Sequence, residues 1–377
     1  MLPAEQRVRA HCMTTRVHAH RKQLFREGRS MRTFNYHSLP QNLFVGNVGD
    51  ATIKIHQDQG RLDLLEGLHP ELLEPMKAET HIENVDASTR IEGIYVDRKR
   101  IAEIVSGSEP TIETEAQIAG YSNALRIAQE RVEELDVATS TILKLFETLY
   151  AHRDLGRRSR YRKKDYMYVQ VDGHPQAVPV SPISAFETPL VLGGACDSLA
   201  EALEASGCSP LVLASVFTVD FLCIRPFDEG NGRVARLTAE LMLEKAGFHI
   251  ARYESIDRII EASAMDYYDA LNACVNQWDQ ARNDYSPYAA YWLDAIHEAY
   301  QRLFEKVDLL LNSNNSKTKR VRLYVQQKRE GITKRQILEE FPDISEATVE
   351  NALGCMVKEG ELQKVGAGRA TSYRVIV

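Results

Sequence analysis

The stretch that most constrains the fold lies between residues 225 and 236 and reads RPFDEGNGRVAR. Gly230 and Gly232 interrupt it, and apolar side chains then recur every three or four residues from Val234 onward. That spacing predicts an amphipathic helix, whereas an Asn-Gly turn alone would favour a hairpin. The two glycines therefore lie in a loop that opens a helix.

A loop of this kind favours an anion, because the first N–H groups of a helix are unpaired and its dipole is positive there. Gly230 and Gly232 let the backbone approach phosphate oxygens closely. Arg233 and Arg236, three residues apart, can face the same anion. Glu229 beside the loop is a suitable oxygen ligand for the Mg²⁺ that accompanies nucleotide phosphates. An ordinary helix start with solvated arginines is the alternative.

Helix-period apolar patterns dominate residues 70–311, so we expect a mainly α domain there, preceded by an arm and lead-in segment at 1–69. The clearest helical runs are 112–135, 138–150, 210–224, 234–246, 255–278 and 288–310. Between two of them, Tyr166–Pro179 alternates in polarity and turns at an Asp-Gly pair, which predicts a β-hairpin. Residues 42–55 are rich in glycine and β-branched residues and predict a short strand or hairpin.

The pattern changes after the polar linker NSNNS at 312–316. Two helices are expected at 318–328 and 333–341, and Ser345 caps a third that ends near Lys358. Two strands about Gly366 complete the chain. This order of elements is typical of a winged-helix domain, which we place at 317–377.

The charge of this C-terminal segment points to two kinds of partner. The segment has twelve Lys and Arg and eight Asp and Glu, which gives it a net charge of +4. Because the net charge of the whole chain is -7, the remainder of the chain has a net charge of -11. A positive winged helix fits DNA phosphates, and Thr348 and Asn351 on its third helix could read base edges. The same helix carries Glu346 and Glu350 and no arginine. Winged helices also serve as dimerisation modules, so both DNA and a second copy of the chain stay open as partners.

The composition of the 377 residues narrows the class of protein further. No stretch has the ~20 apolar residues that a membrane span needs. Six cysteines without a CxxC pair indicate reduced thiols, and we expect a cytoplasmic protein. The basic residues 1–32 lack the apolar core of a secretory signal and are expected to be a disordered arm, or to precede a true start at Met13 or Met31.

The stretch 225–236 resembles the signature of the Fic (Fic/DOC) family, H-P-F-x-[D/E]-G-N-G-R-x-x-R, and matches it at every defined position except Arg225, which replaces the histidine. The resemblance implies a Fic-type helical bundle with a small hairpin flap. It also implies AMP transfer from Mg·ATP to a hydroxyl of a target protein. In such a site Glu229 would hold the metal, while Asn231 and the amides of Gly230 and Gly232 would bind the phosphates. Arg233 and Arg236 would clamp them, and Phe227 would anchor the core.

A second motif lies upstream. Ser88–Gly93 reads STRIEG and resembles the family's inhibitory pattern [S/T]-x-x-x-E-[G/N]. Ser88 and Glu92 share a helix face, and Gly93 suits a helix end. The resemblance implies that Glu92 pairs with Arg236 and displaces the γ-phosphate. A plain surface helix end is the alternative.

The resemblance also gives the segments between the motifs a role. Tyr166–Pro179 would be the flap that holds the target segment by strand addition. The basic run at 157–164 before it would attract an acidic target or form a solvated face. Tyr267 and Tyr268 lie where related proteins carry an adenine-side tyrosine, and they could equally belong to the core.

Arg225 decides which activity we expect. The signature histidine takes the proton from the target hydroxyl, and an arginine stays protonated at neutral pH and cannot do so. We expect an adenylyltransferase scaffold, inhibited by Ser88–Gly93, that binds nucleotide and transfers AMP slowly or not at all. Asp228 or a metal-bound water would be the base for slow transfer, and a different phosphate reaction is a further option. The alternative function is a nucleotide-sensing, DNA-binding regulator without transferase activity.

Overall fold

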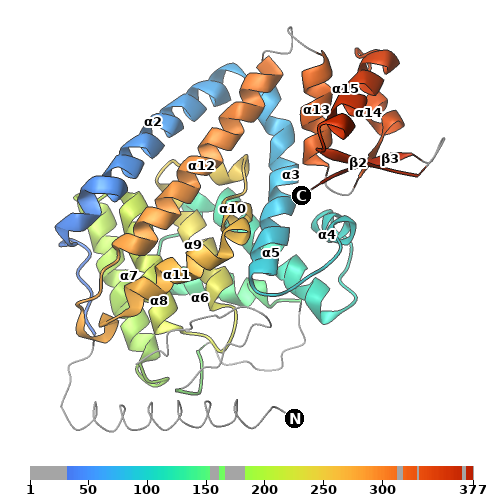
Figure 1. The fold of residues 1–377 in the computed structure, drawn as a ribbon. Coiled ribbons are helices and arrows are strands. Elements are labelled where there is room, and N and C mark those ends of the chain that lie inside the picture. Colours follow the sequence, from blue (N-terminus) through green and yellow to red (C-terminus); the bar gives the residue numbers. More distant parts are fainter. Residues whose placement is uncertain are drawn as a thin grey trace, which may run out of the picture. The chain divides into compact units, whose positions relative to one another are not determined.

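The computed structural model describes residues 32–152, 161–165, 183–311, 317–328, 331–366 and 371–376 (Figure 1). The chain divides into two compact units. The first comprises the chain before His69 and Pro75–Ala299, and the second comprises His69–Glu74 and the chain from Tyr300. The predicted hairpin at 166–179 and the linker at 312–316 lie outside the described residues.

The first unit is helical throughout its described part, as the apolar patterns predict. Its α-helices are α2 (Gly46–Leu68), α3 (Pro70–Ile91), α4 (Arg98–Val105), α5 (Glu113–Glu130), α6 (Thr139–Leu149), α7 (Thr188–Ala205), α8 (Pro210–Ile224), α9 (Asn231–Lys245), α10 (Ile256–Ala262), α11 (Ala264–Val275) and α12 (Ser286–Leu311), the first residues of α3 and the last of α12 belonging to the second unit. Short 3₁₀ turns, η1 (Gln41–Phe44), η2 (Val132–Glu134), η3 (Ile250–Arg252) and η4 (Trp278–Gln280), join them.

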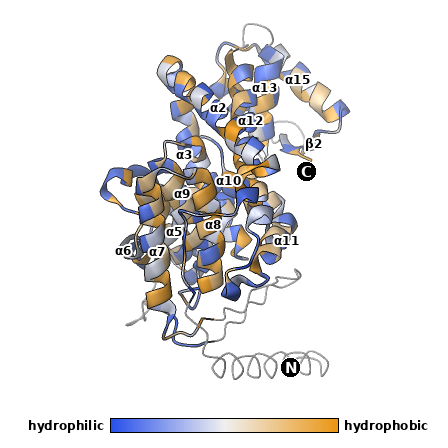
Figure 2. Cartoon of the chain, turned by 90° about the vertical axis from the view of Figure 1, so that its left-hand side faces the viewer, coloured by the Kyte–Doolittle hydropathy of each residue, from blue (hydrophilic) through white to orange (hydrophobic). Residues whose placement is uncertain are grey.

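Helix α8 forms the centre of the first unit. Nearly all its residues are buried, and most are apolar, as the hydropathy colouring in Figure 2 indicates. It packs against α7 and α9, while α5 packs against α6 and α9. Helices α5 and α6 approach closely at Gly120, where a Cβ atom would lie 2.0 Å from the backbone oxygen of Leu149. The absence of a side chain at Gly120 therefore permits this helix crossing.

The predicted strand or hairpin at 42–55 is wrong, because the structure has η1 and the start of α2 there. The buried residues of α2 explain the helix: Val48, Ala51, Ile55 and Leu62 recur at three-, four- and seven-residue intervals. Gly46 lies at the start of the helix with φ +61°. The apolar periodicity of the longer segment thus outweighs the weak helix propensity of its glycines.

The other helical runs are confirmed with small shifts at their ends. The run 112–135 becomes α5 followed by η2, and the run 255–278 divides at Ser263 into α10 and α11. Ser263 ends the first of these helices with its amide bonded to the carbonyl of Ile259. Among the described residues, no helix is both long and apolar enough to cross a membrane.

Arg32 corrects the expected boundary of the basic arm. Its side chain is buried, pairs with Asp220 of α8 at 3.5 Å and donates to the hydroxyl of Tyr285 at 2.7 Å. Asp220 also accepts hydrogen bonds from Tyr36 and Trp278, at 2.7 and 2.6 Å. Burial raises the pKa of Asp220, and these partners oppose that shift. Arg32 is therefore a buried counter-ion of the helical unit, and residues 1–31 lie outside the described part.

The second unit has the predicted order of three helices and a terminal pair of strands. After the start of α3 and the end of α12, it contains α13 (Lys317–Gln327), β1 (Ile332–Thr333), α14 (Lys334–Glu340), α15 (Glu346–Lys358), β2 (Leu362–Val365) and β3 (Ser372–Val375). The strands form an antiparallel sheet in the order β1-β3-β2, with Ile332 opposite Tyr373 and Leu362 opposite Val375. Ser345 caps α15 as predicted, because its side chain accepts a hydrogen bond from the amide of Thr348. The two-residue strand β1 was not predicted.

Candidate functional site

The loop between α8 and α9 has a rigid framework. Helix α8 ends at Arg225, whose φ of +47° places it in the left-handed region. Phe227 is fully buried, and its ring stacks on Phe146 with centroids 3.9 Å apart. The side chain of Asn231 closes the loop by accepting a hydrogen bond from the amide of Phe227 at 3.0 Å and donating to its carbonyl at 2.9 Å. These side chains fix the turn from which α9 starts.

The two glycines of the loop are sites of close approach. Gly230, the N-cap of α9, has φ +77°, and a Cβ there would lie 2.6 Å from the hydroxyl oxygen of Tyr150. A Cβ on Gly232 would lie 2.3 Å from Oε1 of Glu92. A carboxylate oxygen thus lies directly over the first turn of α9. Because the N-cap residue is a glycine, it has no side chain that could accept a hydrogen bond from the first amides of α9.

Arg236 connects α9 to the upstream motif. Its side chain is buried, and its Nε donates to the hydroxyl of Ser88 at 2.9 Å. Its Nη2 donates to the carbonyl of Ser88 at 2.9 Å and to Oε1 of Glu92 at 3.0 Å. Burial alone would lower the pKa of Arg236, but the charges of Glu92 and Asp257 raise it well above its ordinary range. The pair of Glu92 and Arg236 implied by the family resemblance is therefore present.

The end of α3 places Glu92 in this contact. The amide of Gly93 bonds the carbonyl of Arg90 at 2.9 Å, and the amide of Ile94 bonds the carbonyl of Thr89 at 3.0 Å. This is a Schellman motif with Glu92 as the C-cap and Gly93, at φ +78°, as the left-handed residue that follows. The dipole of α3 disfavours an anion at its own C-terminus, whereas the N-terminus of α9 favours one. The Glu92 carboxylate is therefore stabilised by α9 and Arg236.

Arg233 has buried donors that could bind an anion. Its side chain is buried, its Nη2 donates to the hydroxyl of Tyr150 at 3.1 Å, and its guanidinium lies 5.6 Å from that ring's centroid. Within the described residues, Nε and Nη1 of Arg233 are buried without a hydrogen-bond partner. Leaving charged donors buried and unpaired is costly. The residues of the loop therefore fit a bound anion.

Arg225, at the position of the signature histidine, lies at the edge of this site. Burial lowers the pKa of its guanidinium, and the charge of Glu92 opposes that shift. The charge of Glu92 thus acts to raise the pKa of both Arg225 and Arg236, and Arg236 contacts the carboxylate directly. A cation rather than a titratable base stands at this point of the loop.

Glu229 is half-exposed beside the loop, and Asp228 is exposed. Among the described residues, no three His, Cys, Asp or Glu side chains are grouped so that they could hold a metal ion by themselves. A Mg²⁺ bound through one carboxylate and the phosphates of a nucleotide needs no such group. Metal binding by Glu229 therefore stays a prediction.

Arg162 was missed by the sequence patterns, which place it in a solvated basic run. It is almost fully buried, and burial lowers the pKa of its guanidinium. Its three guanidinium nitrogens donate to the backbone oxygens of Arg225, Lys164 and Ile183, at 2.9, 2.8 and 2.6 Å. Its amide also donates to the carbonyl of Pro226 at 2.8 Å. Arg162 therefore links three points of the backbone: the loop at Arg225, Lys164 before segment 166–182 and Ile183 after it.

The two tyrosines that could border an adenine belong partly to the core. Tyr267 is buried and packs edge-to-face against Tyr268, with ring centroids 5.1 Å apart. The hydroxyl of Tyr268 donates to the carbonyl of Ile91 at 3.4 Å. Tyr268 thus contacts the end of α3, next to Glu92.

Four of the twelve basic side chains in the candidate DNA-binding segment pair with carboxylates of the same unit. Thr348, the proposed base-reading residue, has its hydroxyl 2.8 Å from that of Ser345. Several basic side chains of this unit pair with acidic ones: Arg320 with Asp343, Arg322 with Glu359 and Glu361, Lys334 with Glu346 and Glu350, and Arg335 with Glu339. A basic side chain that is paired in this way must exchange its carboxylate partner before it can contact a phosphate.

Comparison with known proteins finds one family model and several solved structures that are similar to this chain. Residues 137–243 match the model of the Fic/DOC family. No curated protein matches the chain. A Fic family protein from Desulfovibrio desulfuricans G20 is similar in structure, with a TM-score of 0.55 and 18% identity over 90% of this chain and 98% of that one.

Two further solved structures are similar. One is a Fic domain containing signaling protein from Bacteroides thetaiotaomicron VPI-5482, with a TM-score of 0.56 and 17% identity over 68% of this chain and 97% of that one. The other is Fic-1 from C. elegans, with a TM-score of 0.51 and 19% identity over 69% and 72%. At these identities the likeness shows a shared fold. The stretch that matches the Fic/DOC family model, residues 137–243, contains the loop, Arg233 and Arg236.

Proposed function

We propose that the first unit is a nucleotide-binding Fic-type scaffold for AMP transfer, held inactive by Glu92 and impaired in transfer because Arg225 replaces the general base. The observation that carries this proposal is the position of the Glu92 carboxylate, which approaches Gly232 and bonds Arg236. A carboxylate and a terminal phosphate both present anionic oxygens. Glu92 therefore occupies the place that a polyphosphate would take.

The chain's own residues have separate tasks in this proposal. The first amides of α9 and the free donors of Arg233 bind phosphate oxygens, and Asn231 keeps the loop in shape for them. Arg236 exchanges Glu92 for the terminal phosphate and keeps its bonds to Ser88. Glu229 would hold the Mg²⁺, which neutralises part of the phosphate charge.

Arg225 separates nucleotide binding from transfer. It adds a cation beside the phosphates, and it cannot take the proton of a target hydroxyl. General-base help contributes ~10²–10⁴-fold to rate, so its loss leaves transfer slow even with full binding. Asp228, exposed on the same loop, is the candidate base for that slow transfer.

The target protein would be held through Tyr166–Pro179 by strand addition. Support comes from Arg162, which bonds Lys164 before this segment, Ile183 after it and Arg225 in the phosphate loop. The described residues on either side of this segment are thereby bonded to the phosphate loop through one side chain. A merely solvated basic run would have no such bonds.

The test uses α-labelled ATP, an added protein substrate and three variants. Glu92→Gly should bind Mg·ATP but transfer little label, and Glu92→Gly with Arg225→His should transfer at least ~100-fold faster. Adding Arg233→Met to Glu92→Gly should abolish both binding and transfer. If Glu92→Gly binds no nucleotide, the proposal fails. If it transfers label as fast as the Arg225→His variant does, the role given to Arg225 is wrong.

A further inference from the structure

Residues 84–89, near the end of α3, are buried on every side. Residues 84–89 are each at most 4% exposed, although four of the six are polar. Asn84 donates from its side chain to the carbonyl of Ala251 at 3.0 Å, and Thr89 donates to the carbonyl of Val85 at 2.7 Å. The remaining two polar residues, Asp86 and Ser88, face different arginines. This end of α3 is therefore held by specific polar contacts.

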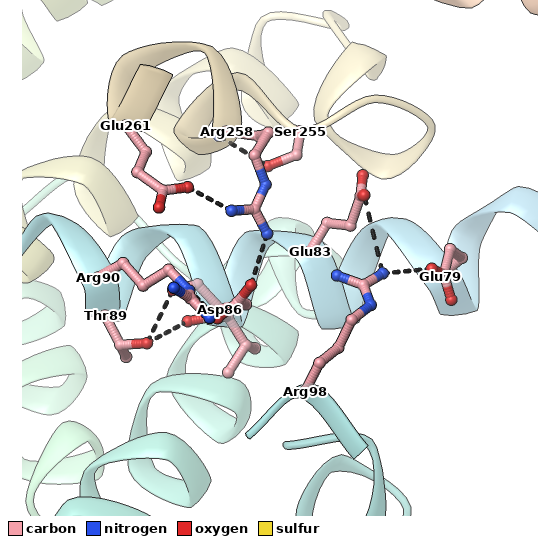
Figure 3. A network of polar contacts seen from close by, with 10 residues as sticks. Glu79, Glu83, Asp86, Thr89, Arg90, Arg98, Ser255, Arg258 and Glu261 are labelled. Carbon is pink, nitrogen blue, oxygen red and sulfur yellow. Dashed lines mark hydrogen bonds and ion pairs between the residues drawn. The ribbon is translucent and has the colours of Figure 1, made fainter. Parts of the chain in front are cut away.

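Asp86 joins α3 to α10 through an ion network (Figure 3). Its Oδ2 accepts from Nη2 of Arg258 at 2.6 Å, and its Oδ1 accepts from Nε of Arg90 at 2.6 Å. Arg258 pairs through Nη1 with Glu261 on its own helix. The side chain of Ser255, the N-cap of α10, accepts a hydrogen bond from the amide of Arg258 at 3.1 Å. Arg258 is thus fixed at both its backbone and its side chain.

The two arginine contacts of α3 lie on different sides of the helix. At ~100° per residue, Ser88 is rotated by about 200° from Asp86, and Glu92 by about 240°. Arg258 therefore holds one side of α3, while Arg236 on α9 contacts the roughly opposite side. A helix held on both sides cannot rotate about its axis or slide along it without breaking the Asp86–Arg258 pair or the bonds between Arg236 and Ser88. Arg90, on the same side as Asp86, continues the contact toward the final turn.

We infer that Arg258 is a positioning residue for Glu92. Its ion pair with Asp86 fixes the rotation of α3 and its position along the helix axis, so that the C-cap carboxylate meets Gly232 and Arg236, and it thereby sets how strongly Glu92 competes with a polyphosphate. The inference rests on the proposed function of this site. It adds a control point on α10, the side chain of Arg258, which bonds Asp86 and Glu261 rather than the phosphate loop or Glu92.

The first experiment measures Mg·ATP affinity by calorimetry in the full chain. Asp86→Asn and Arg258→Met should each tighten binding about tenfold, within the ~5–150-fold range of typical coupling between sites. The effect should not exceed that of Glu92→Gly, and in a Glu92→Gly background both variants should change affinity less than twofold. Arg98→Met is the matched control, because Arg98 pairs with Glu79 and Glu83 on the same helix (Figure 3) and should leave affinity unchanged.

A damaged fold would not tighten binding, so the gain separates positioning from a merely structural role. Unchanged or weaker affinity in folded Asp86→Asn and Arg258→Met would overturn the inference. A gain that persists in the Glu92→Gly background would also overturn it, because the effect would then bypass Glu92.

The second experiment needs no nucleotide and so separates this inference from the proposed function. Hydrogen exchange should be faster at the amides of Gly93 and Ile94 in Asp86→Asn and Arg258→Met than in the wild type, and unchanged in Arg98→Met. If Glu92→Gly binds no Mg·ATP, the proposed function fails, and the exchange of these two amides alone decides the inference. Unchanged exchange in both variants would then contradict it.

Discussion

Glu92 follows α3, and its carboxylate lies next to the first turn of α9. Replacing Glu92 with glutamine removes this negative charge and keeps the size of the side chain. The carboxylate now bonds Arg236 at 3.0 Å and lies over Gly232. Without the charge, Arg236 keeps its two bonds to Ser88 and is freer to bind a phosphate. We expect Glu92→Gln to bind Mg·ATP more tightly than the wild type does.

The size of the effect follows from the contact. A hydrogen bond between charged groups contributes ~1.5–3 kcal/mol. The Glu92 side chain is 26% exposed and Arg236 is 5% exposed, so solvent screens part of the interaction and the lower half of that range applies. About 1.5–2 kcal/mol corresponds to a dissociation constant about 10- to 30-fold lower.

Calorimetry with Mg·ATP at physiological salt measures this change. Glu79→Gln is the matched control, because it also removes a carboxylate from α3. The Glu79 carboxylate pairs with Arg98 and not with the loop. If Glu92→Gly binds more tightly and Glu92→Gln does not, Glu92 acts by its bulk and the electrostatic reasoning is refuted. If neither variant binds more tightly, Glu92 does not occupy an anion site.

Three further results are expected. Gly120→Ala should lower the free energy of unfolding by about 3 kcal/mol in denaturant titrations, because its Cβ would meet the backbone of α6, whereas Gly194→Ala, with open space at its Cβ, should stabilise by about 0.5 kcal/mol. Arg162→Met should cost about 3 kcal/mol and Arg162→Lys nearly as much, since one ammonium cannot reach three carbonyls; full recovery in the lysine variant would contradict this. Burial, followed by the charge of Arg126, lowers the pKa of His81 from 6.5 to about 4. The unfolded chain therefore binds a proton that the folded chain does not, and stability should fall as the pH drops from 6.5 toward 4, by at most ~1.4 kcal/mol per pH unit. In His81→Gln this part of the slope should vanish, and an unchanged slope would refute it.

The helical pattern of the chain was predictable because it depends on local spacing. The runs at 138–150, 210–224 and 234–246 match α6, α8 and α9 within a few residues, and the cap at Ser345 starts α15. The segment 42–55 was misjudged because its glycines suggest turns. Its apolar residues point to one helix face only when the pattern is followed beyond residue 55, to Leu62.

The buried arginines could not be predicted, because their partners are far apart in the sequence. Arg162 bonds backbone oxygens more than 60 and about 20 residues away, at Arg225 and Ile183. Backbone oxygens carry no signature in a sequence, so a basic run gives no sign of this role. Arg32 is a similar case, since its partner Asp220 lies within an apolar helix.

One part of the candidate site was predicted from the residues themselves and the other from a family resemblance. The anion loop followed from Gly230, Gly232 and the arginines that come after them. The contact between Glu92 and Arg236 came from a family resemblance, and the spacing of Ser88 and Glu92 alone did not imply it. The unpaired donors of Arg233 and the ion pair between Arg258 and Asp86 could not be predicted from the sequence. Both depend on which side chains are buried together in the folded chain.

The most direct test is a crystal structure of Glu92→Gly grown with millimolar Mg·ATP. We expect phosphate oxygens within hydrogen-bond distance of Nε or Nη1 of Arg233, of the first amides of α9 and of Arg236, with Arg225 alongside. Nucleotide bound elsewhere, or a loop whose free donors have closed onto protein groups, would contradict the account.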